Sequence, residues 1–582
     1  MNTILLYIRL PHPQTECSLS DPLLCRFQAT LQSTYKRRHP SSGEYCEGYL
    51  SEVFAHLSGW FSEGNKFRIV TNHAKILIEH SDLSERIKCG EYSLRDVPGK
   101  WVSRDTGEVK DISSAIVCVN ESPLILCLDR AYRGEDITIL DLGNYGIKWE
   151  EHVTRTNHDN LTWADDEQYR CKIAGDFQGD GLAVLACIYD HYAKVCRDNR
   201  FGEPSYTYAS QGNGAYYGRR NPVEIRQTTD SRALAIEILS HYGGVRLPFG
   251  YGRFTGECAM YDISAFYPSI ARSAEAPTSL VGVWSETEES LLPVSLQYFY
   301  CIAKVDLRSP DGRYPHRKFT ETTYPTEDFT AYLHHPDLQR ALTLGHVTKV
   351  HCICTYDRGK ILADSMENLL SARAKYIKCG DKLGEHICKC IAVGWLGKLG
   401  SKLSVWEDVD DVIPPADNAE WNTVIHGLPD RDRHRSIYGR VQRKREDLVP
   451  YLGGIAIAGA ITAYGRELLW SLIDYAGPEN VLYADTDGII CCRAAMRRLD
   501  ALTQGAGFRP GVLRRVATGT ECTIASIGVY AIGDKQGHQG YGPEIEGGYD
   551  PSTSPLTGSF AATMHRASQA QFTFYHHHER SE

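Results

Sequence analysis

YDISAFYPSI, residues 261–270, combines the end of an apolar run with an acidic turn, and it decides how the rest of the chain is interpreted. The apolar run of residues 258–261 directly precedes Asp262. After Asp262, the aromatic pair of residues 266–267 is followed by Pro268. Apolar runs bounded by turn residues are typical of buried strands. We therefore predict that Asp262 lies at the end of a strand, with its carboxylate at the rim of a sheet.

A second acidic turn, YADTDG, occupies residues 483–488 and has apolar residues on both sides. This pattern predicts a β-hairpin whose tip carries Asp485 and Asp487. An Asp-x-Asp turn alone is most often only a turn, because Asp favours turns. Two acidic tips that face each other would form an all-oxygen pocket suited to magnesium. Two such ions, about 4 Å apart, stabilise an attacking 3′-oxygen and a leaving pyrophosphate.

The two turns together resemble the first and third polymerase motifs of family B DNA polymerases, D-x-x-S-L-Y-P-S and Y-x-D-T-D-S. The resemblance implies catalytic roles for Asp262, Asp485 and Asp487. It also implies that Asp262, Asp487 and Ile263 bind two Mg²⁺ ions, for which Mn²⁺ could substitute. The implied fold is a multidomain α/β and α+β protein: a right-hand polymerase with a ferredoxin-like palm sheet, fingers and thumb, preceded by an exonuclease-like (RNase H-like) N-terminal domain.

The middle motif of the family, K-x-x-x-N-S-x-Y-G, is matched only at its ends by KCIAVGWLG, residues 389–397. Residues 361–390 predict a helical hairpin broken near Gly380. Lys389, Lys378 and Arg373 on this hairpin would bind the incoming triphosphate. The alternative is that these cations only solvate an exposed helix face.

Other short segments resemble elements that contact the nucleotide or the DNA in the family. Tyr267 would exclude the ribose 2′-hydroxyl. Three segments would contact DNA: the Y-x-G-G-like element, the T-A-x-x-R-like helix predicted over residues 455–473, and the K-x-Y-like element, which lacks its lysine. The residues concerned are Tyr242, Gly243, Gly244, Thr462, Arg466 and Tyr530. Ala265 and Gly488 stand where the family has serine.

The formal net charge of −10 is unexpected for an enzyme that binds nucleic acid. Two basic runs offset it locally, and such stripes can bind phosphates on an otherwise acidic protein. They are Arg431, Arg433, Arg435, Arg440, Arg443, Lys444 and Arg445, then Arg493, Arg497, Arg498, Arg509, Arg514 and Arg515. The first run is either a template contact within an insertion or a solvated loop.

The N-terminal third lacks the acidic set of a 3′-5′ exonuclease. No D-x-E follows an apolar strand within residues 1–80, and Leu77 falls where a second carboxylate belongs. Asp180 could supply one acid, and Asp141 is expected to end a strand. We predict an exonuclease-like scaffold without proofreading; the alternative is an unrelated domain.

The expected organisation is an exonuclease-like domain over residues 1–215, with a linker around residues 211–220, and then a palm interrupted twice. Palm segments cover 216–284 and 449–504, insertions cover 285–355 and 401–448, fingers cover 356–400, and a thumb and tail cover 505–582.

The resemblance is strongest to the protein-primed group of small phages and linear plasmids. The leading hypothesis is a DNA-directed DNA polymerase that adds dNTPs to a 3′-hydroxyl or a protein hydroxyl. Untemplated or unusually primed synthesis in a defence system or mobile element is one alternative, and an inactive DNA-binding scaffold is another.

Partners would be template and primer DNA, dNTPs and, where priming requires it, a terminal or other accessory protein. The 19 cysteines show no paired metal-binding spacing, and no apolar run of about 18 residues predicts a membrane span. We expect a cytoplasmic protein of a bacterial or other host cell, encoded by the host, a virus or a plasmid.

Overall fold

The computed structural model divides into two compact units, one of residues 1–99, 111–222 and 367–397 and one of residues 100–110, 223–366 and 398–582. It describes residues 181–205, 208–218, 222–285, 291–318, 321–409, 420–424, 431–437, 440–450, 454–503, 508–538 and 573–574, and before residue 181 only strands. Both acidic turns lie in the second unit.

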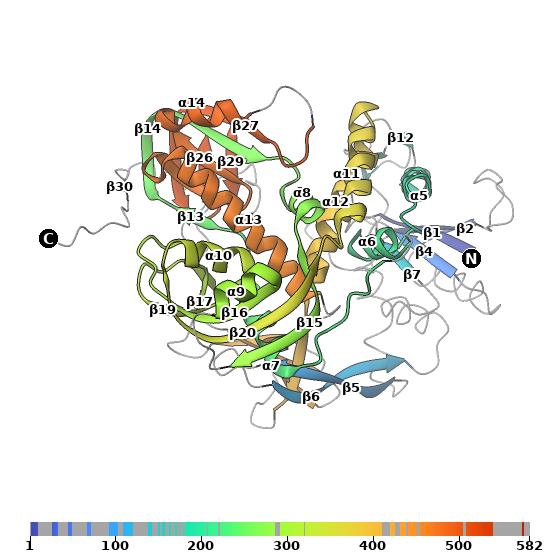
Figure 1. Ribbon diagram of the computed structural model, residues 1–582. Coiled ribbons are helices and arrows are strands. Elements are labelled where there is room, and N and C mark those ends of the chain that lie inside the picture. The colour runs from blue at the N-terminus through green and yellow to red at the C-terminus, as the bar shows by residue number, and fades with distance from the viewer. Residues whose placement is uncertain are drawn as a thin grey trace. The chain divides into compact units, whose positions relative to one another are not determined.

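An antiparallel sheet in the second unit carries the acidic turns (Figure 1). Its order is β13-β25-β26-β14-β27-β28-β29, and β30 pairs with β14. The strands are β13 Arg246–Pro248, β14 Gly250–Ile263, β25 Val481–Asp485, β26 Gly488–Cys492, β27 Leu513–Ser526, β28 Val529–Ile532, β29 Lys535–His538 and β30 Thr573–Phe574. The predicted strand at Asp262 and the predicted acidic hairpin are both confirmed.

Residues 508–538 and 573–574 are the described part of the predicted thumb and tail. Residues 513–538 extend the palm sheet, because β27 pairs with β14 from Gly252 to Ile263. The core of the sheet includes Leu482, Ile490, Cys522 and Ile524, all fully or almost fully buried. Burial of such side chains stabilises the sheet by about 1.5–3 kcal/mol each.

Helices α13, Ile455–Ala476, and α14, Arg493–Leu502, pack on this sheet. The helix predicted over residues 455–473 is therefore confirmed. α13 buries apolar side chains along most of its length, whereas α14 buries only Ala495 and Leu499. The helix α8, Phe266–Ser273, follows Asp262 and packs against α13, and η3, Pro478–Asn480, precedes β25.

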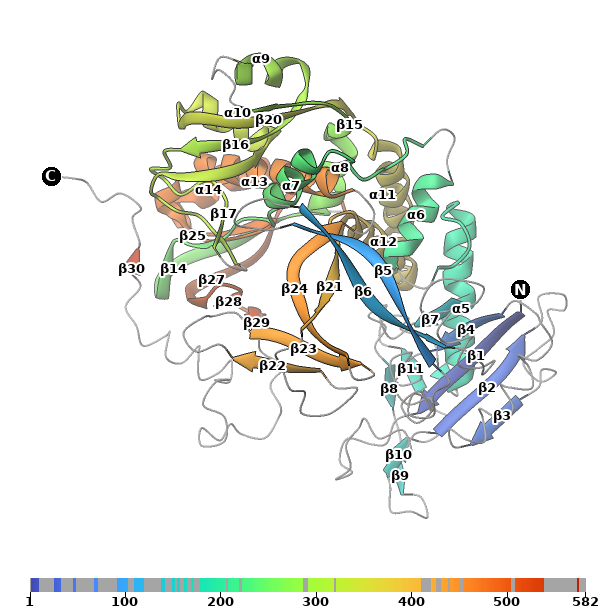
Figure 2. The same cartoon turned by 90° about the horizontal axis from the view of Figure 1, so that it is seen from below.

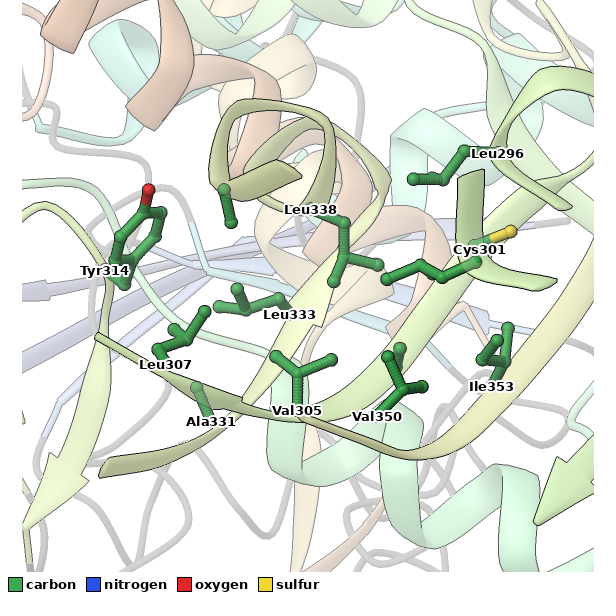
Figure 3. Packing of buried hydrophobic residues seen from close by; sticks show 13 residues of the cluster. Leu296, Cys301, Val305, Leu307, Tyr314, Ala331, Leu333, Leu338, Val350 and Ile353 are labelled. Carbon is green, nitrogen blue, oxygen red and sulfur yellow. The ribbon is translucent and has the colours of Figure 1, made fainter. Parts of the chain in front are cut away.

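A second antiparallel sheet fills the first predicted insertion and extends beyond both its ends. Its order is β15-β20-β16-β19. The side chains of Val305, Leu333 and Leu338 lie in its buried core, which Figure 3 shows between strands and helices. The elements are β15 Ala276–Ser285, α9 Leu291–Tyr298, β16 Tyr300–Leu307, β19 Phe329–His334, α10 His335–Thr343 and β20 Val347–Gly359, with the hairpin β17 His316–Lys318 and β18 Glu321–Thr323 and, earlier in the chain, α7 Ser231–Ser240.

The first basic run lies on strands. A four-stranded sheet of order β21-β24-β23-β22 occupies the second predicted insertion, and Figure 2 shows it in orange. Its strands are β21 Lys402–Asp408, β22 Glu420–Val424, β23 Arg431–Ile437 and β24 Arg440–Pro450. The run therefore does not lie in a loop, because β23 pairs with both neighbours.

The first unit contains the predicted helical hairpin, which is confirmed as α11, Ala363–Lys378, and α12, Lys382–Leu399. Gly380 between them has a φ of +72°, a backbone conformation that glycine adopts without strain. Helices α5, Gly181–Asp198, and α6, Tyr208–Tyr217, belong to the same unit.

The predicted linker is wrong for residues 211–217, which lie in α6. Gln211 is buried, accepts a hydrogen bond from the Tyr192 hydroxyl at 2.8 Å and donates one to the Phe201 carbonyl at 2.5 Å. Gly212 packs so closely against Trp395 that a Cβ atom would collide with its side chain. Here glycine serves close helix packing, which composition alone does not distinguish from a linker.

The N-terminal strands form a mixed sheet of order β3-β2-β1-β4-β7, in which β2 is antiparallel to β1 and β3, and β4 is parallel to β1 and β7. Asp141 ends β7, as expected. Leu77 and Asp180 lie outside the described residues. The N-terminal strands are β1 Asn2–Arg9, β2 Arg26–Gln32, β3 Tyr45–Gly48, β4 Phe67–Thr71, β5 Tyr92–Val102, β6 Val109–Val119, β7 Thr138–Asp141, β8 Trp149–Glu151, β9 Thr154–Thr156, β10 Thr162–Ala164, β11 Tyr169–Cys171 and β12 Gln178–Gly179.

Candidate active site

The strand β14 and the β25–β26 hairpin bring Asp262 and Asp487 to the same edge of the palm sheet. Asp262 pairs with Gly488 in the strand register, and the Ile263 amide donates to the Asp487 carbonyl oxygen at 2.8 Å. A Cβ atom at Gly488 would collide with the carbonyl oxygen of Tyr261. The two strands therefore approach too closely at this position for a side chain.

The carboxyl groups of Asp262 and Asp487 interact directly. Burial, and then the charge of Asp262 and a hydrogen bond to it, raise the pKa of Asp487 to about 7. Arg514 on β27 forms an ion pair with Asp262, with 2.9 Å between Nη2 and Oδ2, and its own side chain is largely exposed. Two close carboxylates oppose each other's ionisation, so a cation bound between them would relieve that repulsion.

Asp485, in the same turn, has its charge balanced within the chain. Arg246 on β13 donates to both of its oxygens, at 3.0 and 3.3 Å. The hydroxyl groups of Tyr483 and Thr486 donate to it at 3.0 and 3.1 Å. These bonds fix the orientation of the Asp485 carboxylate beside the Asp262–Asp487 pair.

Backbone strain occurs at both acidic turns. Ala265 has a φ of +49° and Thr486 a φ of +54°, in the left-handed region that costs residues with a side chain about 1–2 kcal/mol. Ala265 is the N-cap of α8 and makes no capping hydrogen bond through its side chain. Such strain persists only where the surrounding structure enforces it, and it is commonest at functional sites.

Tyr267 lies between two glycines. A Cβ atom at Gly244 would be 2.7 Å from the Tyr267 hydroxyl, and one at Gly465 would be 3.1 Å from its Cε1. Burial raises the pKa of Tyr267 to about 12, and the nearby Asp487 and Asp485 carboxylates add to the increase. The ring is therefore held tightly beside the acidic turns.

Residues predicted to bind DNA lie beside this site, but two of them are buried. The Tyr242 ring lies within 6 Å of the guanidinium groups of Arg317 and Arg466. Arg466 is only 1% exposed and pairs with Asp337 of α10 at 2.5 Å. Neither side chain is placed for a direct DNA contact, which corrects the prediction, because each is enclosed by its partners within the unit.

The remaining predicted DNA contacts are more open or only partly buried. A Cβ atom at Gly243 would meet no other atom within 4 Å. Tyr530 is half-buried against Tyr483, with 5.4 Å between ring centroids. Burial raises the pKa of Tyr530, and the carboxylates of both acidic turns add to this, which places it near them. The Thr462 hydroxyl donates to the Gly459 carbonyl oxygen within α13.

The predicted triphosphate ligands lie on the first unit. Lys389 on α12 and Lys378 on α11 are exposed. Arg373 instead forms an ion pair with Glu385 at 3.0 Å and is mostly buried. Its charge is therefore balanced between the two helices of the hairpin, which corrects its prediction as a free phosphate ligand.

The sequence interpretation missed Arg246 and did not assign Arg514 to the site. Both reach the carboxylates from strands next to β25 and β14. A possible signal for Arg246 was its position two residues after the glycine pair, at the start of an apolar run. The pairing of β13 with β25 was the missing information.

The donor set suits a magnesium ion. Carboxylate oxygens of Asp262 and Asp487, with the backbone carbonyl of Ile263, are ligands of the hard type that this ion prefers. Within the described residues, no group of three or more His, Cys, Asp or Glu side chains is placed to hold a metal. In the same part of the chain, no helix is long and apolar enough to cross a membrane.

Comparisons with known proteins agree with the motifs. Residues 233–410 match the family described as DNA polymerase type B, organellar and viral. No curated protein matches the chain in sequence.

Structures of phi29 DNA polymerase are similar in fold. The complex with primer-template DNA has a TM-score of 0.55 at 12% identity, covering 91% of this chain and 86% of that one. The ternary complex with primer-template DNA and incoming nucleotides has a TM-score of 0.52 at the same identity and coverage. The match over residues 233–410 and the right-hand polymerase fold, together with the motifs, support a divergent family B DNA polymerase.

Proposed function

We propose that this DNA polymerase extends a primer on a DNA template by two-metal nucleotidyl transfer and does not proofread. The observation that carries the proposal is the pair of facing carboxylates, Asp262 and Asp487, at the rim of the palm sheet. Burial, and then the charge of Asp262 and a hydrogen bond to it, raise the pKa of Asp487 to about 7, so the free site favours either a proton or a cation.

Asp262, Asp487 and the Ile263 carbonyl would hold Mg²⁺, or Mn²⁺ in its place. The bound ions would stabilise the charge that develops on the attacking and leaving oxygens. In the reaction, the primer oxygen forms a bond to the α-phosphorus of a dNTP, and the bond to pyrophosphate breaks. Asp485, held by Arg246, keeps the turn in place.

The substrate contacts come from several elements. Tyr267, held between Gly244 and Gly465, would exclude the ribose 2′-hydroxyl. Lys389 and Lys378 would bind the triphosphate, with Arg373 fixing the helical hairpin through Glu385. Gly243, Gly244, Tyr530 and the basic strands β23 and β24 would contact DNA, as the similar phi29 structures are complexes with primer-template DNA and, in one, incoming nucleotides.

Priming and location are further parts of the proposal. The resemblance to the protein-primed group leads us to propose that the primer is a DNA 3′-hydroxyl or a hydroxyl of a terminal protein. The 11 cysteines whose side chains the structure describes are free, which supports action in a reducing compartment such as the cytoplasm.

The N-terminal domain would be an exonuclease-like scaffold without nuclease activity. Its mixed sheet, with β1 central and β4 and β7 parallel to it, supports an RNase H-like arrangement. β1 is NTILLYIR and carries no acid, whereas the exonuclease of the family has D-x-E on its first strand.

The test is incorporation of labelled dNTPs by the purified protein with Mg²⁺, with and without a primed template. We expect template-dependent extension that EDTA abolishes, and no removal of a mispaired primer end. Homopolymer formation without template would favour untemplated synthesis instead. No incorporation with either a DNA primer or a protein hydroxyl would contradict the proposal.

A further inference from the structure

The loop at residues 241–244 has four successive backbone carbonyls, each of which accepts a hydrogen bond from a side chain. Arg317 Nη2 donates to the His241 carbonyl at 2.5 Å. Arg466 Nη1 donates to those of Tyr242 and Gly243 at 3.3 and 3.0 Å. The Tyr324 hydroxyl donates to that of Gly244 at 3.3 Å.

The donors depend on the first insertion. Arg317 lies on β17, and Tyr324 follows β18 directly. Arg466 belongs to α13, but Asp337 of the insertion helix α10 binds its guanidinium through two hydrogen bonds, at 3.2 and 2.5 Å. The insertion therefore determines where this loop lies, either directly or through Arg466.

The same loop contacts Tyr267 and the turn that carries Asp485 and Asp487. Gly244 lies against the Tyr267 hydroxyl and against Thr486, leaving no space for a side chain. The next residue, Val245, accepts a hydrogen bond from the Thr486 amide at 2.7 Å. A shift of the loop would therefore move both Tyr267 and the turn that carries Asp487.

We propose that Arg317 and Tyr324 are positioning residues for the nucleotide pocket, and that through the loop they set how strictly Tyr267 excludes ribonucleotides. The inference rests on the proposed polymerase function. Neither residue needs to touch the substrate. They act by fixing the Gly244 backbone under the Tyr267 hydroxyl, which leaves the ring no room to retreat from a 2′-hydroxyl group.

The alternative is that these bonds only stabilise the fold. A purely structural role predicts lower stability and less active protein, with an unchanged preference for deoxynucleotides. A positioning role predicts a changed ratio of kcat/KM for dNTP to that for the matching rNTP. That ratio does not depend on the fraction of protein that is folded, so it separates the two roles.

The experiment compares Arg317→Ala, Arg317→Lys and Tyr324→Phe with wild type, with Arg308→Ala as the control. Arg308 lies in the same insertion, but its side chain is 70% exposed. Tyr324→Phe removes one hydroxyl and keeps the buried ring, so it tests the idea even where Arg317→Ala fails to fold. The readout is single-nucleotide insertion of a dNTP and its rNTP on one primed template.

We expect Arg317→Ala to lower the deoxynucleotide preference by about ten-fold or more, because a misplacement of about 1 Å can change a rate by on the order of 10²-fold. Arg317→Lys should restore part of the deoxynucleotide preference. Tyr324→Phe should lower this preference by about three-fold, as for the loss of one weak hydrogen bond. Arg308→Ala should not change it. An unchanged deoxynucleotide preference in Tyr324→Phe and in the folded Arg317 variants would overturn this inference and leave the proposed function intact. A wild-type protein that incorporates no nucleotide would instead overturn the proposed function, and the inference with it.

Discussion

Two regions of the second unit hold carboxylates away from bulk water, the acidic turns and the contact between α10 and α13. At the second region, Asp337 meets the buried guanidinium of Arg466 in a two-bond ion pair. At the first, Asp262 and Asp487 face each other, and Arg514 reaches only Asp262 from an exposed position. Where the chain supplies a buried cation, the carboxylate is structural. Where two carboxylates lie together, a cation from outside would complete the site.

The largest expected effect comes from Asp487→Asn, which removes one charge of the facing pair. Primer extension should fall on the order of 10⁴-fold, equivalent to about 5 kcal/mol of transition-state stabilisation. The free energy of unfolding without metal should stay equal or rise, because the repulsion with Asp262 is gone.

The measurements are steady-state extension and urea unfolding of the same preparation. Asp328→Asn, at an exposed carboxylate of the insertion, is the control and should leave both unchanged. Activity of Asp487→Asn within ten-fold of wild type would contradict a metal-binding role for this residue.

Asp337→Asn should have the next largest effect, and on stability. It leaves the Arg466 guanidinium buried without its counter-charge, which costs about 3–5 kcal/mol. Urea unfolding measures the loss. Glu257→Gln is the control, because Glu257 on β14 pairs with Arg493 of α14 at 3.0 Å with both side chains exposed, and its loss should cost less than about 1 kcal/mol.

The double variant Asp337→Leu/Arg466→Met tests whether the unpaired charge of Arg466 causes the loss of stability. Replacing both partners by apolar groups removes the unpaired charge, so it should lose less stability than Asp337→Asn alone. A double variant that is as unstable as the single one would show that the loop bonds of Arg466 matter more than its charge.

The pH dependence of stability is a smaller effect, and the Asp487→Asn variant assigns part of it to the acidic turns. The folded-state pKa of Asp487, about 7, lies above its usual value of 3.8. Its protonated form therefore favours the folded state fully below about pH 4, and this contribution is lost as pH rises through about 7. Metal-free protein should become less stable over that interval, and Asp487→Asn should reduce the slope.

Thermal unfolding at a series of pH values, with EDTA or with Mg²⁺, measures this. Magnesium should raise Tm more at pH 8 than at pH 5, because the ion binds the ionised carboxylates. An equal shift at both pH values would argue against binding at the Asp262–Asp487 pair.

The sequence was sufficient for the parts of the site that local patterns determine. Apolar runs and turn residues predicted the strand before Asp262, the hairpin around Asp485 and Asp487, and the helical hairpin broken at Gly380. Each of these depends on neighbours within a few residues in the chain. The family motifs added the order in which these elements form a palm and fingers.

Features that depend on distant partners could not be predicted in the same way. The burial of Arg466 follows from Asp337, 129 residues away in the chain. The contact of Arg246 with Asp485 spans 239 residues. Likewise, Gln211 and Gly212 have the composition of a linker, and only the packing of Gly212 against Trp395 shows why they form a helix.

Backbone strain is found at the acidic turns, and relieving it is expected to give the smallest of these effects. Ala265, with a φ of +49°, should be relieved by Ala265→Gly, with a gain of about 1 kcal/mol in unfolding free energy. Ala494→Gly, at an exposed position in α14, should instead lose about 0.5–1 kcal/mol. The strain matters for function only if it helps to aim Asp262, so Ala265→Gly should be more stable but slower in primer extension, by about two- to five-fold, or about 0.4–1 kcal/mol. A variant that is both more stable and fully active would mean that the left-handed turn is a cost of the fold and not a means of placing the carboxylate.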